Sequence, residues 1–183
     1  MITGYAPGYL TEETVETEAE TETETESETE SESEFEAETV DFTPEDCSVV
    51  PAVFSEVSSE YDSRYPANAL LDGNPASGWS STADDSEPTF TMELGTPTDI
   101  SSIVFNNYPA GGDEYADDAV EGIYVSTFDE EENEIVLVDD VAAQDTEYKY
   151  FYFDTVTAET LYITFTSNYG GDFFEASDII VCE

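Results

Sequence analysis

The feature that most restricts the fold of this chain is a series of short apolar runs, separated by turns, that begins near residue 41. The runs are rich in Val, Ile, Thr, Tyr and Phe, which pack well on a half-buried pleated surface. Several alternate with the two-residue period of a strand, and no comparable stretch shows helical spacing with capping residues. This pattern predicts an all-β fold, a sandwich or barrel of about eight strands. The expected strands are residues 48–57, 89–94, 100–107, 122–128, 134–141, 148–156, 160–167 and 176–182.

Residues 1–40 have a different composition, dominated by Glu that alternates with Thr and Ser. A strand with this alternation would carry like charges along one face and would have almost nothing apolar to bury. Charge repulsion therefore favours an extended, disordered tract. We expect an acidic spacer over residues 1–40, with Thr and Ser as candidate O-glycosylation sites, and a β-sandwich domain over residues 41–183.

The charge balance excludes several classes of partner. The chain has 46 acidic residues, no His and only two basic residues, Arg64 and Lys149, for a formal net charge of −44. Salt bridges cannot offset this repulsion, so salt or divalent cations should stabilise the fold. Nucleic acid is excluded as a partner because its binding depends on Lys and Arg that neutralise phosphates. Direct docking on an anionic membrane is disfavoured for the same reason.

The sequence also lacks the residues of common catalytic sites. Without His, the usual nucleophilic triads are absent. The chain has no phosphate-cradling glycine loop and no zinc-ligand spacing. Glycoside cleavage needs two carboxylates in a defined geometry, which an abundance of acids does not supply. We therefore expect no enzymatic activity.

The two cysteines, Cys47 and Cys182, flank nearly all of the predicted β region. Their positions are compatible with two buried thiols or with one disulfide. A disulfide that closes so long a loop would stabilise the fold by at most about 5 kcal/mol in the chain-entropy description, and it would indicate an oxidising, extracellular setting. The first ten residues lack the basic and apolar segments of a secretory signal. The alternatives are an export signal outside this sequence, another export route, or a chain made inside a cell, and we expect the first.

The segment ALLDGNPASGW, residues 69–79, contains the single Trp of the chain. Taken alone, Asp-Gly-Asn is a turn sequence, because Asp supplies local hydrogen bonds and Gly tolerates a positive φ. Asp72, Asn74 and Ser77, together with carbonyl groups freed by the turn, also offer oxygen ligands at short spacing, which suit a hard cation such as calcium. We expect Trp79 to pack beneath this loop in the core.

Several segments, taken in order, resemble the discoidin family, which is also called coagulation factor five/eight type C and includes galactose-binding-like carbohydrate-binding modules. They are SSEYDSRYPANALLDGNPASGWSS, TFTMELGTPTDISSIVFNN, GIYVSTFDEE, AETLYITF and ASDIIVC. The resemblance covers roughly residues 45–183 and implies a jelly-roll β-sandwich. In such domains a disulfide often joins the N-terminal and C-terminal strands, which would pair Cys47 with Cys182.

The resemblance also implies a structural calcium ion between the Asp-Gly-Asn loop and the last strand. Such an ion would pin a long loop to the terminal strand, and about six or seven oxygen ligands suit calcium. The expected ligands are the carbonyl of Ala69, Asp72, Asn74, the hydroxyl and carbonyl of Ser77, the carbonyl of Ser177, and the carboxylate of Asp178.

Sugar-binding members of this family use loops at one end of the sandwich, where an aromatic residue of the last long loop stacks on the sugar ring. Here that loop is SNYGGDFFEAS, which places Phe173 near the stacking position, with Tyr169 and Phe174 close by. Phe173 and Phe174 are equally compatible with an inward orientation. The first loop, SSEYDSRYPAN, offers Tyr61, Asp62, Arg64 and Tyr65, of which Arg64 is one of only two basic residues in the chain.

The sequence departs from the family at one further candidate ligand-binding position. Tyr108 stands where the family frequently has an arginine, and the chain has no His, so the usual galactose-binding set is incomplete. The acidic loop AGGDEYADDAVEG would repel uronate or sialate ligands. A neutral sugar, a protein partner or no ligand at all remain as alternatives.

Two functions follow from this sequence. The first is an extracellular or cell-surface binding module, carried on an acidic stalk, that attaches its parent protein to a carbohydrate or a surface glycoprotein and is stabilised by calcium. The second is a structural domain of a surface layer, filament or virion, in which the same sandwich packs against copies of itself without sugar binding.

Overall fold

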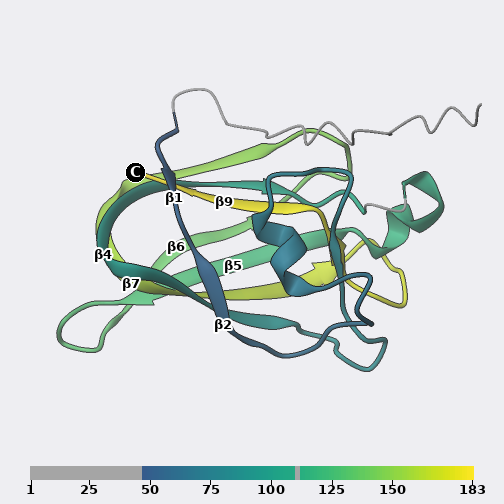
Figure 1. Cartoon of the computed structure of the whole chain (residues 1–183), viewed down its shortest axis with the longest axis horizontal. Helices are drawn as coiled ribbons and strands as arrows, with labels where there is room; N and C mark the ends of the chain where they lie inside the picture. The colour runs from purple at the N-terminus through teal and green to yellow at the C-terminus, as the bar shows by residue number, and fades with distance from the viewer. Residues whose placement is uncertain (1–46, 110–111) are drawn as a thin grey trace, which may run out of the picture. The chain divides into compact units, whose positions relative to one another are not determined.

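Two long, bent strands organise the fold in the computed structural model, which describes residues 47–109 and 112–183. Strands β4 (Thr89–Asn106) and β7 (Lys149–Asn168) pair with each other in antiparallel orientation. Both strands bend sharply at the left of Figure 1. The ladder between them is irregular from Glu93 to Thr98, and the two halves of each strand lie in different layers.

The bend in β4 follows from the local sequence Leu-Gly-Thr-Pro. Gly95 has a φ of 78°, a left-handed conformation that residues with a Cβ rarely adopt. Pro97 has no N–H group for a ladder hydrogen bond. The expected strands 89–94 and 100–107 are therefore the two halves of β4. In the same way, the expected strands 148–156 and 160–167 are the two halves of β7.

The remaining strands complete a two-layer antiparallel sandwich. One layer contains β2, the first half of β4, the second half of β7, β5 and β6, and the other contains β1, β9 and the remaining halves of β4 and β7. A separate two-stranded sheet pairs β3 with β8. This architecture confirms the predicted all-β sandwich. The element bounds are β1 Val49–Val50, β2 Val53–Val57, β3 Trp79–Ser80, β5 Val120–Phe128, β6 Glu134–Val141, β8 Glu175–Ala176, β9 Asp178–Cys182, and the 3-10 helices η1 Ala67–Leu71 and η2 Asp113–Asp118.

The expected strand 48–57 is divided by Pro51 and Ala52 into β1 and β2. A proline cannot donate a ladder hydrogen bond, so strand pairing stops at that point. As a result β1 pairs with β9 in one layer, whereas β2 pairs with β4 in the other.

The core is built around a cluster of aromatic side chains between the layers. The ring centroid of Trp79, which is 1% exposed, lies 4.9 Å from that of Phe90 and 5.6 Å from that of Phe165. Phe165 in turn lies 5.1 Å from Phe90 and 5.6 Å from Phe105. The indole N–H of Trp79 donates to the carbonyl of Ser59 at 2.9 Å, so the buried polar atom is satisfied. Trp79 is therefore a core residue, as predicted.

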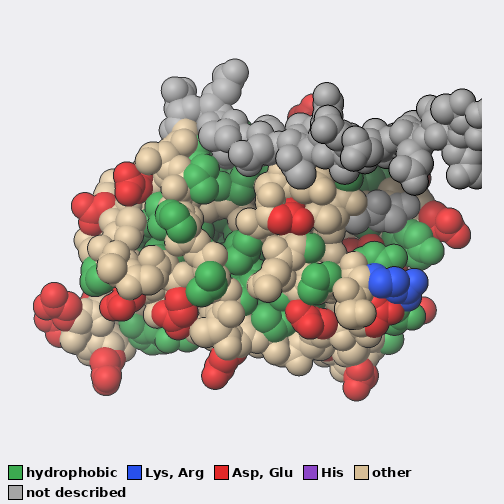
Figure 2. All heavy atoms as spheres, in the orientation of Figure 1, with side chains coloured by type: hydrophobic (Ala, Val, Ile, Leu, Met, Phe, Trp, Pro, Cys, Tyr) green, Lys and Arg blue, Asp and Glu red, His purple; other side chains and the backbone are tan. Residues whose placement is uncertain are grey.

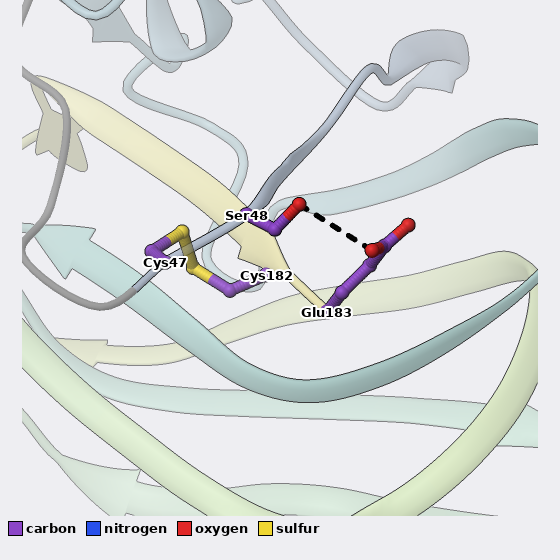
Figure 3. Close-up of a disulfide and its surroundings, with 4 residues drawn as sticks. All are labelled: Cys47, Ser48, Cys182 and Glu183. Carbon is purple, nitrogen blue, oxygen red and sulfur yellow. Dashed lines mark hydrogen bonds between the residues drawn. A yellow bond between two sulfur atoms is a disulfide. The ribbon is translucent and has the colours of Figure 1, made fainter.

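A disulfide between Cys47 and Cys182 joins the first and last described segments (Figure 3). The two Cα atoms are 5.3 Å apart, and the residues are separated by 135 positions in the sequence. Beside it, the Ser48 hydroxyl donates to the Glu183 carboxylate at 3.3 Å. The cross-link thus closes the sandwich where β1 pairs with β9.

All described residues belong to one compact unit. The expected acidic spacer, residues 1–40, lies outside the described residues. Within the described ranges, no helix has the length and apolar character needed to span a membrane.

Candidate functional site

The Asp-Gly-Asn loop forms directly after η1 and is closed by its own side chains. One oxygen of the Asp72 carboxylate accepts from the backbone N–H of Asn74 at 2.8 Å, and the other accepts from the Ser77 hydroxyl at 2.7 Å. Gly73 has a φ of 69°, which a side chain would disfavour. The loop therefore gathers carboxylate, hydroxyl and amide oxygens within a few residues.

The buried carboxylate of Asp178 connects this loop to the start of β9. It accepts hydrogen bonds from the backbone N–H of Gly73 at 3.2 Å and from the Tyr148 hydroxyl at 2.7 Å. Burial raises the pKa of Asp178 to about 6, and the negative charge of Asp72 acts in the same direction, whereas the two hydrogen bonds oppose the shift. Burial and the bond to Asp178 raise the pKa of Tyr148, which keeps its hydroxyl protonated as a donor.

The two carboxylates share this region without a basic partner. Both basic residues of the chain form ion pairs elsewhere, Arg64 with Asp62 at 2.7 Å and Lys149 with Asp145. Two neighbouring carboxylates, one of them fully buried, favour a bound cation because it would neutralise their charge.

The oxygen donors of the loop suit calcium better than a transition metal. Among the described residues, no three His, Cys, Asp or Glu side chains are grouped to hold a metal ion, so any site here depends on two carboxylates supplemented by hydroxyl and carbonyl oxygens. The structure brings Asp72, Asn74, Ser77 and Asp178 together.

The other two expected ligands make contacts of their own. Ala69 is buried in η1, and its N–H donates to the carbonyl of Pro66 at 3.0 Å. The hydroxyl of Ser177, which is also buried, donates to the carbonyl of Tyr108. Neither contact involves the Asp72 loop, and neither uses the carbonyl group of Ala69 or Ser177.

A second candidate site is a pocket of about 190 Å³ lined mainly by aromatic side chains. The ring of Phe173 meets the ring of Tyr61 edge to face, with centroids 5.3 Å apart and an interplanar angle of 86°. The ring centroid of Tyr61 also lies 6.3 Å from that of Tyr65. The pocket is lined by Tyr61, Arg64, Tyr65, Ser80, Tyr115, Phe173 and Glu175.

Hydrogen bonds hold in place the two loops that carry Phe173 and Tyr61. The N–H of Phe173 donates to the carboxylate of Asp118 at 3.0 Å, and the Asn168 side chain donates to the carbonyl of Gly171 at 3.0 Å. In the first loop, the N–H of Tyr61 donates to the carbonyl of Ser80 at 2.8 Å. The backbone segments that carry the rings of Phe173 and Tyr61 are therefore held in place, which lowers the entropic cost of binding a ligand.

Two ionisable side chains supply the polar groups of the pocket. The guanidinium of Arg64 is held by the carboxylate of Asp62 at 2.7 Å and lies 5.5 Å from the centroid of the Tyr65 ring. Burial raises the pKa of Glu175 to about 7, assisted by the charge of Asp118 and opposed by a hydrogen bond with Ser80. Near neutral pH the Glu175 carboxyl thus exists in both forms and is able to donate or accept a hydrogen bond.

The sequence pattern of the F5/8 type C domain matches residues 55–178 of this chain. The chain belongs to the F5/8 type C domain family. This confirms the family resemblance noted in the sequence. No curated protein sequence matches the chain.

Solved structures with the fold of this F5/8 type C domain include several family 32 carbohydrate-binding modules. One is the module of NanJ from Clostridium perfringens in complex with galactose, with 20% identity, a TM-score of 0.59, and coverage of 74% of this chain and 98% of that chain. Another Clostridium perfringens module, in complex with GalNAc-β-1,3-galactose, has 15% identity, a TM-score of 0.63, and coverage of 74% and 100%. The module of EndoD from Streptococcus pneumoniae has 16% identity, a TM-score of 0.61, and coverage of 74% and 98%. These likenesses support the jelly-roll form of the sandwich.

Three of the six expected ligand-binding residues line the pocket of this F5/8 type C domain, namely Arg64, Tyr65 and Phe173. The other three lie outside its lining and have contacts of their own. Phe174 is buried in the core, and Tyr169 donates its hydroxyl to the carbonyl of Ala142 at 2.6 Å. The hydroxyl of Tyr108 donates to Asp113, which raises the pKa of Tyr108.

Sequence reasoning missed Ser80, Tyr115 and Glu175 as part of this pocket. Tyr115 belongs to the acidic segment that forms η2, and Glu175 belongs to β8. A bridge between Ala119 and Glu175 brings the segment after η2 alongside β8. The signals in the sequence were a single aromatic residue in a polar segment and an acid directly after two Phe residues.

Proposed function

We propose that this F5/8 type C domain is a non-catalytic extracellular module that binds a neutral carbohydrate in the aromatic pocket. The observation that carries the proposal is the edge-to-face contact between Phe173 and Tyr61, which line a pocket together with Arg64. Tyr61 is 48% exposed and Tyr115 is 44% exposed, so aromatic surface remains available to a ligand. Matched modules of the same fold in complex with galactose and with GalNAc-β-1,3-galactose support a sugar as the ligand class.

Each group in the pocket has a chemical role in this proposal. The apolar face of a sugar ring packs against the aromatic side chains, which supply contact area at low entropic cost. The Arg64 guanidinium donates hydrogen bonds to sugar hydroxyls, and the Glu175 carboxyl donates or accepts one, because its pKa is raised to about 7. The guanidinium of Arg64 is the only cation among the lining residues and is already paired with Asp62. Glu175 also lines the pocket, and Asp118 accepts from the N–H of Phe173, so a neutral sugar is favoured over an anionic one.

The proposal includes a structural calcium ion at the Asp72 loop. Asp72, Asn74, Ser77 and Asp178 would hold it, with the carbonyls of Ala69 and Ser177 as further donors. When bound, the ion would supply positive charge to two carboxylates that otherwise repel each other. The buried position of Asp178 supports this role, because its charge has no basic partner among the described contacts. The loop would then be tied to β9 by a cation as well as by the Gly73 hydrogen bond.

A glycan array in calcium-containing buffer tests the sugar site. We expect binding to neutral galactose- or GalNAc-type sugars that falls about tenfold in Phe173→Ala, because the ring contact is lost. Tyr152→Ala is the matched control, since Tyr152 is 75% exposed and lies outside the pocket. Equal loss in both variants would contradict the assignment.

The same experiment addresses the structural alternative. A lack of binding to every neutral sugar, together with concentration-dependent oligomers in sedimentation, would favour a domain that packs against copies of itself.

A further inference from the structure

A second groove, of about 540 Å³, lies where β4 and β7 bend and the β5–β6 hairpin turns. The bend and the hairpin are at the left of Figure 1, whereas η2, which contributes Tyr115 to the aromatic pocket, is the teal helix at the right. The two sites therefore lie toward opposite ends of the sandwich. The groove is lined by Pro97, Thr127, Phe128, Asp129, Glu130, Ile135, Val156, Thr157, Ala158, Glu159, Thr160 and Tyr162.

Two exposed aromatic side chains form the apolar part of this groove. Phe128 is 47% exposed and Tyr162 is 41% exposed, and their rings meet edge to face with centroids 5.3 Å apart. Val136 of β6, which is 51% exposed, pairs with Ser126, and Ser126 pairs with Tyr162 on the other side. Exposed apolar side chains that adjoin one another and are rimmed by polar residues mark interaction surfaces.

The charged residues that line this groove are all acidic, namely Asp129, Glu130 and Glu159. Hydrogen bonds from Asn133, and then from Glu131, hold the pKa of Asp129 below its usual value, so this carboxylate remains charged. The two basic residues of the chain are paired elsewhere. In Figure 2, acidic side chains are spread over the visible face, this end included, and the basic atoms that can be seen lie at the opposite end.

We propose that this groove binds a basic peptide segment of a partner protein. The aliphatic stem and cation of an arginine or lysine pack on the exposed faces of Phe128 and Tyr162, because aromatic rings attract cations. The carboxylates of Glu130 and Glu159 accept its hydrogen bonds. Charge complementarity selects a basic occupant over a second copy of this acidic chain, since two copies would bring like charges together. The proposal does not depend on sugar binding at the aromatic pocket.

Calorimetric titration with the N-acetylated peptide amide Arg-Leu-Arg-Leu, at physiological ionic strength, tests this proposal. We expect Phe128→Ala to weaken binding about tenfold through loss of the cation–aromatic contact. Glu159→Gln should weaken it about threefold. Both residues are exposed, so melting temperatures near that of the wild type would show that the variants remain folded.

Two matched controls separate the groove from the general negative field of the protein. Asp140→Asn removes one exposed charge from the far end of β6, and Tyr152→Ala removes an exposed ring outside the groove. Each should change the affinity less than about twofold. A loss in Asp140→Asn equal to that in Glu159→Gln would reveal diffuse electrostatic attraction and overturn the proposal. Unchanged binding in Phe128→Ala, or no binding to the wild type, would also overturn it.

Discussion

The backbone N–H of Gly73 donates a hydrogen bond of 3.2 Å to the buried carboxylate of Asp178, which lies 105 residues later in the chain. This contact joins the Asp-Gly-Asn loop to the final strand. It also places the buried charge of Asp178 near Asp72, whose negative charge raises the pKa of Asp178. The stability of this part of the fold should therefore depend on whether a cation is present.

Calcium should raise the melting temperature of the protein relative to the chelated form. If calcium binds only the folded state, a calcium concentration of about 100 times its Kd raises the free energy of unfolding by about 2.7 kcal/mol. This corresponds to a rise in melting temperature on the order of 5–10 °C. Differential scanning calorimetry at matched ionic strength measures the shift. Asp178→Asn should lose most of it, whereas Asp84→Asn, at an exposed position outside the loop, should retain it. The same melt in EDTA and in calcium would refute the calcium site.

Reduction should destabilise the domain. The disulfide closes a loop between positions 135 residues apart, and its loss releases unfolded-state entropy worth up to about 5 kcal/mol. Chemical denaturation with and without reductant measures the difference, and the Cys47→Ser/Cys182→Ser double variant serves as a control that reductant should not affect. Thiol titration of the denatured, unreduced protein should find no free thiol. Two reactive thiols would show that the bond does not form.

The stability of the chelated protein should fall as pH rises toward neutral, in part through Glu175. Its pKa rises from 4.5 to about 7 on folding, so between these values the folded state binds more protons than the unfolded state. The free energy of unfolding therefore decreases with pH in this window, by up to about 1.4 kcal/mol per pH unit for one proton.

Denaturant titrations across this pH range test the assignment. Glu175→Gln should reduce the dependence of the free energy of unfolding on pH between about pH 4.5 and about pH 7. Glu87→Gln, which changes an exposed acid of the same kind, should leave the slope as in the wild type. A Glu175→Gln profile parallel to that of the wild type would mean that other carboxylates cause the pH dependence.

Phe165→Ala should lower the free energy of unfolding by about 3–5 kcal/mol. Phe165 is fully buried, and its ring contacts Trp79, Phe90 and Phe105, so truncation leaves a cavity in the aromatic core. Tyr152→Ala provides the comparison, because Tyr152 is 75% exposed and its loss should cost less than about 0.5 kcal/mol. Urea denaturation followed by circular dichroism measures both. Similar losses would argue against the aromatic cluster as the centre of the core.

The sequence predicted the strands well because burial on one face imposes a two-residue period, as in residues 89–94. It did not predict that β4 continues through Gly95 and Pro97, since both residues usually end a strand. Here the chain bends at Gly95 and resumes pairing with β7 at Thr98. The low strand propensity of Gly and Pro predicts a break in the strand at this point. Only the partner strand determines whether pairing continues beyond the break.

The candidate sites were predictable to different degrees. Asp72, Asn74 and Ser77 lie in one short loop, and the hydrogen bond from Gly73 to Asp178 joins that loop to β9. Tyr115 and Glu175 reach the aromatic pocket through the pairing of Ala119 with Glu175, a long-range contact that the local sequence around either residue does not predict. The second groove also depends on tertiary structure, because Phe128 and Tyr162 belong to neighbouring strands that are distant in sequence.

The disulfide has a mechanical consequence. Because Cys47 and Cys182 are covalently joined, a pulling force applied at these two residues is transmitted through the sulfur–sulfur bond and bypasses the strands between them. The sandwich would then carry almost none of the load, and a tether that includes this domain would resist extension without unfolding it. Single-molecule stretching should show no release of contour length from residues 48–181 until the bond is reduced.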